Sequence, residues 1–230
     1  MDNRNTGLVI TIDGPAGAGK STVAKELAKR LDFKYINTGD LYRYVTYCAL
    51  QENLDENNAR EMDILSKKIV KKYSKDNNYL TLINQNKFIT EEIHSPEVNK
   101  KVSYVARHPA VRKNLAPLQR MLAKRGSVVM EGRDIGSVVI PYAEIKFFIT
   151  ANKYTRIKRR YKELKEKGYK VTFQEVKEEI TNRDYLDSKR KIAPLTKPEN
   201  AIVINTSHKN INEVVEIMLT KIQELRDKQQ

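Results

Sequence analysis

A lysine and a serine close a glycine-rich segment whose spacing suits the binding of phosphate groups. The segment is Gly14-Pro15-Ala16-Gly17-Ala18-Gly19-Lys20-Ser21, followed by Thr22, and it fits the pattern G-x-x-x-x-G-K-[ST]. In such a loop the glycines allow backbone angles that turn several N–H groups toward a phosphate. We expect Lys20 to reach the β- and γ-phosphates of a nucleotide and the Ser21 hydroxyl to bind Mg²⁺.

The flanking residues predict the strand and the helix that such a loop requires. Residues 8–12 are apolar and β-branched, which indicates a buried strand. Residues 22–31 place Val23, Leu27 and Leu31 on one side of a predicted amphipathic helix. The N-terminus of that helix adds partial positive charge at the phosphates. The alternative is a glycine turn that fits the pattern by chance, and the flanking elements argue against it.

A second group of residues could hold another phosphate. Residues 37–43 read Asn-Thr-Gly-Asp-Leu-Tyr-Arg and follow a short predicted strand at 34–37. Thr38 lies at the strand-to-helix turn, and Arg43 follows Gly39 by one helical turn. A hydroxyl and a guanidinium can together donate hydrogen bonds to a phosphate. The alternative is an ordinary helix N-cap with an exposed arginine.

Two further segments carry charges suited to nucleotides. Residues 131–136, Glu-Gly-Arg-Asp-Ile-Gly, follow a predicted buried strand at 127–130, and ligands of parallel sheets bind at the carboxyl ends of strands. Arg133 and Asp134 could reach a phosphate and a base, or could form only a turn-stabilising ion pair. Residues 153–191 are basic and predicted to be helical, and the alternative for them is a solvated helix. The arginines of this segment are Arg156, Arg159, Arg160, Arg183 and Arg190.

Composition limits the class of protein. The chain has 230 residues with 43 Lys and Arg against 29 Asp and Glu, a net charge of +14 that favours polyanionic partners. It has no zinc-finger ligand set, no aromatic RNA-binding signature and no apolar run long enough for a transmembrane helix. The N-terminus lacks the apolar stretch of a signal peptide, and one cysteine, Cys48, excludes an internal disulfide. We therefore expect a cytoplasmic protein.

The remaining pattern predicts an α/β fold with a parallel sheet and helices on both faces. Residues 53–78 have helical periodicity, and residues 102–124 form a long predicted helix broken near Pro109, with a second break near Pro117 left open. A β-hairpin is predicted from residues 79–83 and 87–90. Further strands are predicted at 145–149 and 201–204, and a last helix at 211–227.

Together the motifs resemble those of the bacterial cytidylate kinase family of P-loop nucleoside monophosphate kinases. The matching pieces run in family order: GPAGAGKST at 14–22, NTGDLYR at 37–43, TEEIHSPEV at 90–98, HPAVR at 108–112, EGRDIGSVVIP at 131–141 and RDYLDSKRKIAPL at 183–195. The last two are much more specific than the P-loop. Thr38 and Asn37 depart from the Ser and Asp that are frequent in the family.

The resemblance implies a P-loop NTPase-type fold and a site for two nucleotides. Its core would span 1–55, 98–152 and 192–230, with a nucleoside-monophosphate-binding insertion at about 56–97 and a lid at about 153–191. ATP would bind residues 14–22, with Mg²⁺ on Ser21. The transferred phosphoryl group would be stabilised by Lys20, Arg133, Arg159 and Arg190.

The acceptor site implied by the resemblance is equally concrete. Thr38, Tyr42, Arg43 and Arg133 would surround the acceptor phosphate; Ser103, Arg112 and Asp134 would bind the cytosine edge; and Arg183 and Asp187 would hold the ribose with Arg190 nearby. The expected activity is transfer of the γ-phosphoryl of ATP to CMP or dCMP by a monomer, without nucleic acid or membrane partners. The alternatives are a kinase for another small acceptor, such as a different nucleoside monophosphate or shikimate, and a basic nucleotide-regulated RNA-binding protein.

Overall fold

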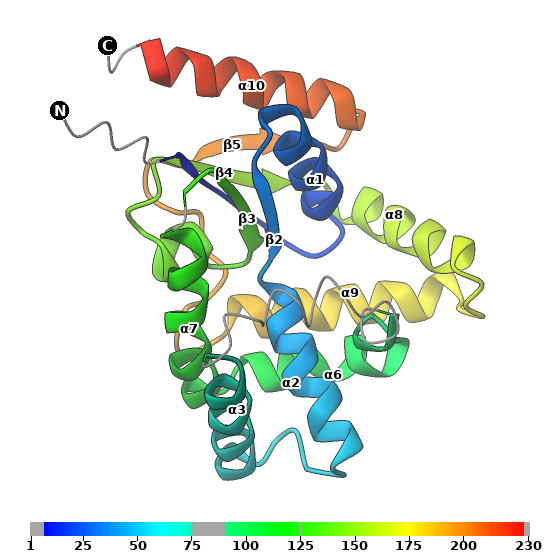
Figure 1. Cartoon of the computed structure of the whole chain (residues 1–230). Helices are drawn as coiled ribbons and strands as arrows, with labels where there is room; N and C mark the ends of the chain where they lie inside the picture. The colour runs from blue at the N-terminus through cyan, green and yellow to red at the C-terminus, as the bar shows by residue number, and fades with distance from the viewer. Residues whose placement is uncertain (1–6, 75–90, 125, 228–230) are drawn as a thin grey trace, which may run out of the picture. The chain divides into compact units, whose positions relative to one another are not determined.

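A computed structural model describes residues 7–74, 91–124 and 126–227 (Figure 1). The chain divides into two compact units. The first holds residues up to Ile36, Ala123–Lys189 and the chain from Ala193, and the second holds Asn37–Leu122 and Arg190–Ile192. The predicted hairpin at 79–83 and 87–90 lies outside the described residues.

The first unit is built on a five-stranded sheet in the order β2-β3-β1-β4-β5. The pairings of β1 with β3, β1 with β4 and β4 with β5 are parallel, as the alternation of strands and helices predicts. The strands are β1 Val9–Asp13, β2 Lys34–Asn37, β3 Val128–Gly132, β4 Ile145–Thr150 and β5 Ile202–Asn205. Because β1 lies in the middle of the sheet, all five of its residues are buried. The loop after β1 therefore starts from the centre of the sheet.

Two helices cover one face of this sheet, α1 (Lys20–Leu31) and α10 (Ile211–Asp227). Figure 1 shows them together beside the strands. Their apolar faces join Ile10, Ile12 and Phe147 in one buried cluster. This cluster fixes the direction in which α1 leaves the glycine-rich loop.

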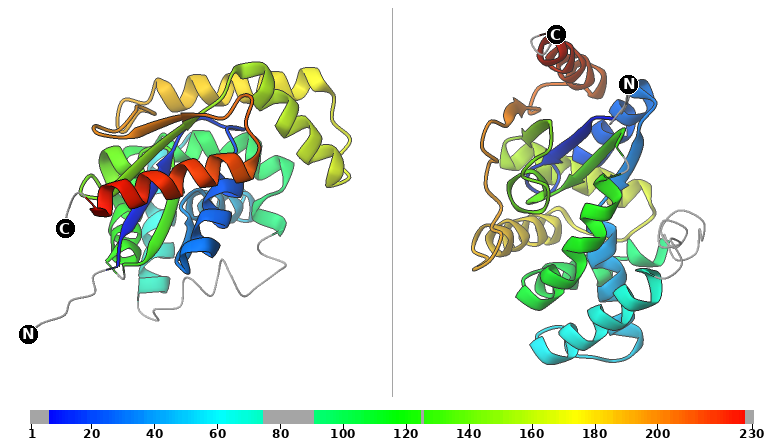
Figure 2. Two further views of the ribbon diagram at one scale, coloured as in Figure 1. Left: turned by 90° about the horizontal axis from the view of Figure 1, so that it is seen from above. Right: turned by 60° about the vertical axis from the view of Figure 1, so that its left-hand side comes forward.

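Two more helices of the first unit, α8 (Lys153–Glu166) and α9 (Phe173–Ser188), pack against each other as a helical hairpin (Figure 2). Ile157, Leu164, Val176 and Ile180 form its small apolar core. A capping box of Thr172 and Glu175 starts α9. The hairpin confirms the helical prediction for the basic segment.

The second unit is helical in its described part and contains α2 (Gly39–Gln51), α3 (Ala59–Ser74), α6 (Pro96–Ala106) and most of α7 (Pro109–Ala123). Helix α2 packs against α3 and α6. This unit is larger than the insertion predicted at about 56–97, because α2, α6 and most of α7 belong to the same compact unit as α3. The functional division into core, insertion and lid stays a prediction.

Several element boundaries differ from the sequence prediction. Helix α1 starts at Lys20 rather than at residue 22. Helix α2 starts at Gly39, directly after the predicted turn at Thr38. The long helix predicted at 102–124 is two helices that separate just before Pro109, and Pro117 lies inside α7. A short π-helix, η1 (Ile135–Val139), follows β3 and was not predicted from the sequence.

Candidate active site

The glycine-rich loop leaves β1 at Gly14 and ends at Gly19, the N-cap of α1. A side chain at Gly14 would lie 2.0 Å from the carbonyl oxygen of Ile149, so the loop runs too close to β4 for any other residue. The first turn of α1 has no acidic residue. Its positive N-terminal end is therefore open to an anion.

Lys20 is buried at the start of α1, and its Nζ donates a hydrogen bond of 2.9 Å to the carbonyl oxygen of Pro15. Burial, together with the charges of Arg133 and Arg183, holds the pKa of Lys20 well below its usual value. Glu131 and Asp187 oppose this effect. A bound phosphate would supply negative charge beside Lys20 and would therefore stabilise its ammonium group.

Ser21 and Thr22 follow Lys20 and are exposed on the first turn of α1. In the part of the chain that the structure describes, no group of three His, Cys, Asp or Glu side chains could hold a metal ion. Mg²⁺ commonly binds one or two protein oxygens and takes its other ligands from substrate phosphates and water. The Ser21 hydroxyl fits that mode of binding.

Arg159 contacts the outer side of the glycine-rich loop. Its Nη1 donates to the hydroxyl of Thr206 at 2.9 Å and to the carbonyl oxygen of Ala18 at 3.4 Å. Its Nη2 donates to the carbonyl oxygen of Thr206 at 2.6 Å. Partial burial lowers the pKa of Arg159. In this structure Arg159 supports the loop, and its predicted contact with the transferred phosphoryl group stays a prediction.

The turn after β3 is held by a carboxylate from β1. Both oxygens of Asp13 accept backbone hydrogen bonds, from the N–H of Ile135 at 2.9 Å and from that of Gly136 at 2.7 Å. Asp13 is fully buried, and burial raises its pKa to about 6 despite these two hydrogen bonds. The predicted ligand Asp134 directly precedes this anchored turn and is itself buried. Asp13 thereby positions the segment that carries Arg133 and Asp134.

Arg133 and Asp187, which the resemblance places on phosphate and ribose, form an ion pair. Arg133 Nε donates to Asp187 Oδ2 at 2.8 Å, and the Asp187 side chain is 2% exposed. Asp187 lies in the last turn of α9, one turn after Arg183. This ion pair thus joins the turn after β3, which carries Arg133, to the end of α9, which carries Arg183 and Asp187.

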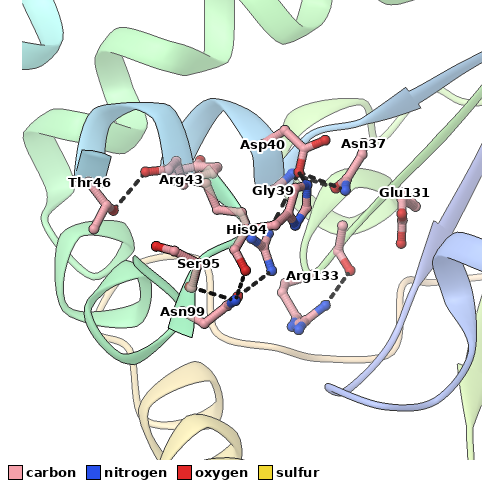
Figure 3. A network of polar contacts seen from close by, with 12 residues as sticks. Asn37, Gly39, Asp40, Arg43, Thr46, His94, Ser95, Asn99, Glu131 and Arg133 are labelled. Carbon is pink, nitrogen blue, oxygen red and sulfur yellow. Dashed lines mark hydrogen bonds and ion pairs between the residues drawn. The ribbon is translucent and has the colours of Figure 1, made fainter. Parts of the chain in front are cut away.

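In the second unit, Arg43 lies in a network of polar side chains (Figure 3). Its Nη2 donates to Asn99 Oδ1 at 3.2 Å, and its Nη1 lies 3.9 Å from Asp40 Oδ1. Asp40 also accepts from Asn37 at 2.8 Å and lies 3.2 Å from His94 Nε2. With a side chain only 12% exposed, Arg43 is not the exposed arginine of the alternative interpretation. Its guanidinium is held in one orientation, as a phosphate ligand requires.

Three other predicted acceptor ligands of the second unit are buried on three helices, Tyr42 on α2, Ser103 on α6 and Arg112 on α7. The Arg112 guanidinium lies 5.4 Å from the ring centre of Tyr42 and donates to the carbonyl oxygen of Ala106 at 3.1 Å. Thr38 is buried at the start of α2, but its side chain does not cap that helix. Arg190 also belongs to this unit.

The residues that orient these ligands were not predicted from the sequence. Asp40 precedes Arg43 by three residues, a spacing that places two side chains on one helical face and could have been recognised. Asn99 and His94 come from a distant part of the chain and have no such signal.

Comparisons with known proteins agree with the motifs. A family model described as cytidylate kinase matches residues 10–224. A cytidylate kinase of Anoxybacillus flavithermus is 46% identical over 94% of this chain and 96% of its own length. A cytidylate kinase of Caldanaerobacter subterraneus is 49% identical over 92% of this chain and 93% of its own length. Among solved structures, a shikimate kinase of Acinetobacter baumannii in complex with shikimate has a TM-score of 0.48 and 14% identity, covering 95% of this chain and 94% of that chain.

Proposed function

Because the chain belongs to the cytidylate kinase family, we propose that it transfers the γ-phosphoryl group of ATP to the 5′-phosphate of CMP or dCMP. The products are CDP or dCDP and ADP. The observation that carries the proposal is the family match over residues 10–224, which includes the glycine-rich loop, with Lys20 buried at its end. As part of this proposal the enzyme is cytoplasmic, in keeping with its single cysteine. Among the residues that the structure describes, no helix is long and apolar enough to cross a membrane.

In this proposal the glycine-rich loop binds the phosphates of ATP. Backbone N–H groups of residues 14–19 and the start of α1 would contact the phosphate oxygens, and Lys20 would follow the charge that develops between the β- and γ-phosphates. Mg²⁺, held by the Ser21 hydroxyl, would neutralise further phosphate charge. Phosphoryl transfer requires mainly positioning and charge neutralisation, so no covalent enzyme intermediate is needed.

The acceptor phosphate would be bound by Thr38, Tyr42, Arg43 and Arg133. The fixed guanidinium of Arg43 supports this role, since a preoriented donor loses little entropy on binding. Arg183, Asp187 and Arg190 would hold the ribose and the region between the nucleotides. Closure of the basic lid would exclude water and suppress hydrolysis of ATP.

The cytosine base would be recognised by Ser103, Arg112 and Asp134. Cytosine offers an amino donor, which the Asp134 carboxylate can accept, and a carbonyl and ring nitrogen, which Ser103 and Arg112 can satisfy. Uracil reverses part of this pattern. A buried site made for cytosine therefore leaves polar groups unpaired when uracil binds.

A coupled assay of ADP release, with each common nucleoside monophosphate and with shikimate as acceptor, tests the proposed function. CMP and dCMP should give the highest kcat/KM. Turnover of shikimate or of a purine nucleotide above that of CMP would refute the substrate assignment while leaving the kinase chemistry intact. Absence of ADP release with every acceptor would refute the kinase assignment itself.

A further inference from the structure

Arg156, in the first turn of α8, is a buried arginine that joins three segments of the first unit. Its Nη1 donates to the carbonyl oxygen of Ala16 in the glycine-rich loop at 3.0 Å, and its Nε donates to the carbonyl oxygen of Ala151 at 3.1 Å. Nη1 and Nη2 also contact the two carboxylate oxygens of Asp184 on α9 at 3.0 and 2.8 Å. Only 7% of Arg156 is exposed. A solvated lid arginine, the alternative interpretation of this segment, has no such set of partners.

The contact with Ala16 matters because of how a phosphate-binding loop works. When the N–H groups of the loop turn toward a phosphate, its carbonyl groups turn away and need donors elsewhere. Arg156 is the donor for Ala16. Gly17 follows with φ of +72°, and a side chain there would lie 2.8 Å from the carbonyl oxygen of Arg156. The loop therefore packs directly on the backbone of Arg156 as well as on its guanidinium.

The contact with Asp184 fixes the part of α9 that carries predicted ligands. Asp184 directly follows Arg183 and precedes Asp187 by three residues, within one turn of the helix. A bidentate contact between a guanidinium and a carboxylate defines orientation as well as distance. Holding Asp184 thus sets the place of Arg183 and Asp187 relative to the glycine-rich loop.

Given the proposed kinase function, we propose that Arg156 and Asp184 are a positioning pair for the ATP site. Arg156 holds the phosphate-binding loop through the carbonyl of Ala16, and its ion pair with Asp184 fixes the position of α9 relative to that loop. Neither residue touches the nucleotide. The same two lid helices offer a matched control, because Arg160 on α8 lies 3.6 Å from Glu179 on α9. Arg160 also pairs with Glu163 on α8, so that, within the described chain, both of its ion-pair partners are lid glutamates.

The test measures binding of ADP by calorimetry without any acceptor, for Asp184→Asn, Arg156→Lys, the double variant and the control Glu179→Gln. Asp184→Asn keeps the shape of the side chain, and lysine keeps the charge of Arg156 but not its planar fork. We expect Asp184→Asn to weaken ADP binding by about fivefold and Arg156→Lys by about tenfold, with the double variant close to Arg156→Lys because the residues act as a unit. Glu179→Gln should stay within about twofold. In the coupled assay, KM for ATP should rise, and KM for CMP should rise as well, because α9 carries Arg183 and Asp187.

Thermal unfolding of each variant separates positioning from stability. If Asp184→Asn and Arg156→Lys bind ADP within about twofold of the parent and only their melting temperatures fall, the pair contributes to stability alone and the proposal is wrong. An equal loss of ADP binding in Glu179→Gln would also overturn the proposal, since any lid ion pair would then suffice. If Arg156→Lys does not fold, the Asp184→Asn result decides alone. Because ADP binding needs no acceptor, failure of the proposed function would appear separately, as absence of CMP turnover in the parent protein.

Discussion

Lys20 combines burial with neighbouring positive charges, so its ammonium group is poorly stabilised until a phosphate binds. Replacing it with alanine removes the charge that would follow the migrating phosphoryl group. We expect Lys20→Ala to lower kcat by at least about two orders of magnitude, in the range seen for loss of one preorganised transition-state contact. Steady-state kinetics check this, with circular dichroism to confirm folding. Unchanged turnover in a folded variant would refute the role of the loop.

Replacing Arg43 should change mainly KM for CMP, whereas replacing Arg133 should also change the melting temperature. Arg43→Ala should lower kcat/KM for CMP by about tenfold to a hundredfold, through KM, with little change in KM for ATP. Arg133→Ala removes the partner of the buried Asp187 carboxylate, so it should lower both CMP affinity and the melting temperature. Adding Asp187→Asn should restore part of the melting temperature without restoring CMP affinity. An Arg43→Ala effect confined to ATP would contradict the proposed acceptor role.

Asp134 should govern the choice of base rather than the binding of phosphate. Asp134→Ala removes the acceptor proposed for the cytosine amino group, and an unpaired buried donor costs about 1–3 kcal/mol. The ratio of kcat/KM for CMP over that for UMP should therefore fall by about tenfold or more, since UMP has no amino group to leave unpaired. A ratio equal to that of the parent enzyme would make Asp134 a structural residue. Ser103 and Arg112 would then have to account for base selection.

The turn between β3 and η1 depends on Asp13, a residue of another strand. Its pKa is raised from 3.8 in the reference state to about 6 in the folded protein, chiefly by burial. Between these values the folded state binds more protons than the unfolded state. The contribution of Asp13 to the free energy of unfolding is therefore greatest below pH 3.8 and is lost as the pH rises through about 6.

Asp13→Asn tests this linkage because asparagine does not titrate. From pH 4 to pH 7 the stability of the parent relative to the variant should decrease, by on the order of 2–3 kcal/mol. Above about pH 6, where the parent carboxylate accepts both backbone N–H groups, the variant should lose one of these two hydrogen bonds, since an amide offers a single acceptor oxygen. Denaturant unfolding across this pH range gives both quantities. A stability difference independent of pH would show that Asp13 has an ordinary pKa.

Elements with strong local signals were predicted well. Strand β2 and helix α10 have the predicted boundaries, and the break before Pro109 was expected because proline cannot donate a backbone hydrogen bond. Helix α1 begins two residues earlier than its apolar pattern indicated, because Gly19 at the end of the glycine-rich loop is the N-cap and Lys20 is the first helical residue. The π-helix η1 was missed because its start depends on the carboxylate of Asp13, more than a hundred residues away.

The candidate site was predictable to the extent that its ligands lie in contiguous motifs. Lys20, Arg43 and Arg133 were proposed as ligands from motifs next to predicted strands. The groups that orient them come from elsewhere in the chain: Asn99 holds Arg43, and Arg156 holds the loop through Ala16. Sequence spacing carries no information on such contacts, because folding alone brings the partners together. Arg156 was therefore seen only as one member of a basic segment.

The net charge of +14 left open whether the protein binds RNA. Several cations have internal partners: Arg156 binds Asp184, Arg133 binds Asp187, and Arg112 donates to a backbone carbonyl. These groups are not available as a surface for a nucleic acid backbone. The remaining charge suits attraction of nucleotides at low salt, a long-range effect that ions screen within about 8 Å at physiological ionic strength.

We therefore expect RNA binding to be weak and strongly salt-dependent, as for non-specific contacts, with a Kd no tighter than about 1 µM at physiological salt. Filter binding of a single-stranded RNA over a range of KCl concentrations measures this, and saturating ATP with CMP serves as the competitor. The KM for ATP should rise only modestly over the same range, because the loop backbone and the buried Lys20 are shielded from the solvent ions. Submicromolar RNA binding that persists at physiological salt and is released by ATP would instead favour the RNA-binding alternative, since it would couple the nucleotide site to the basic surface.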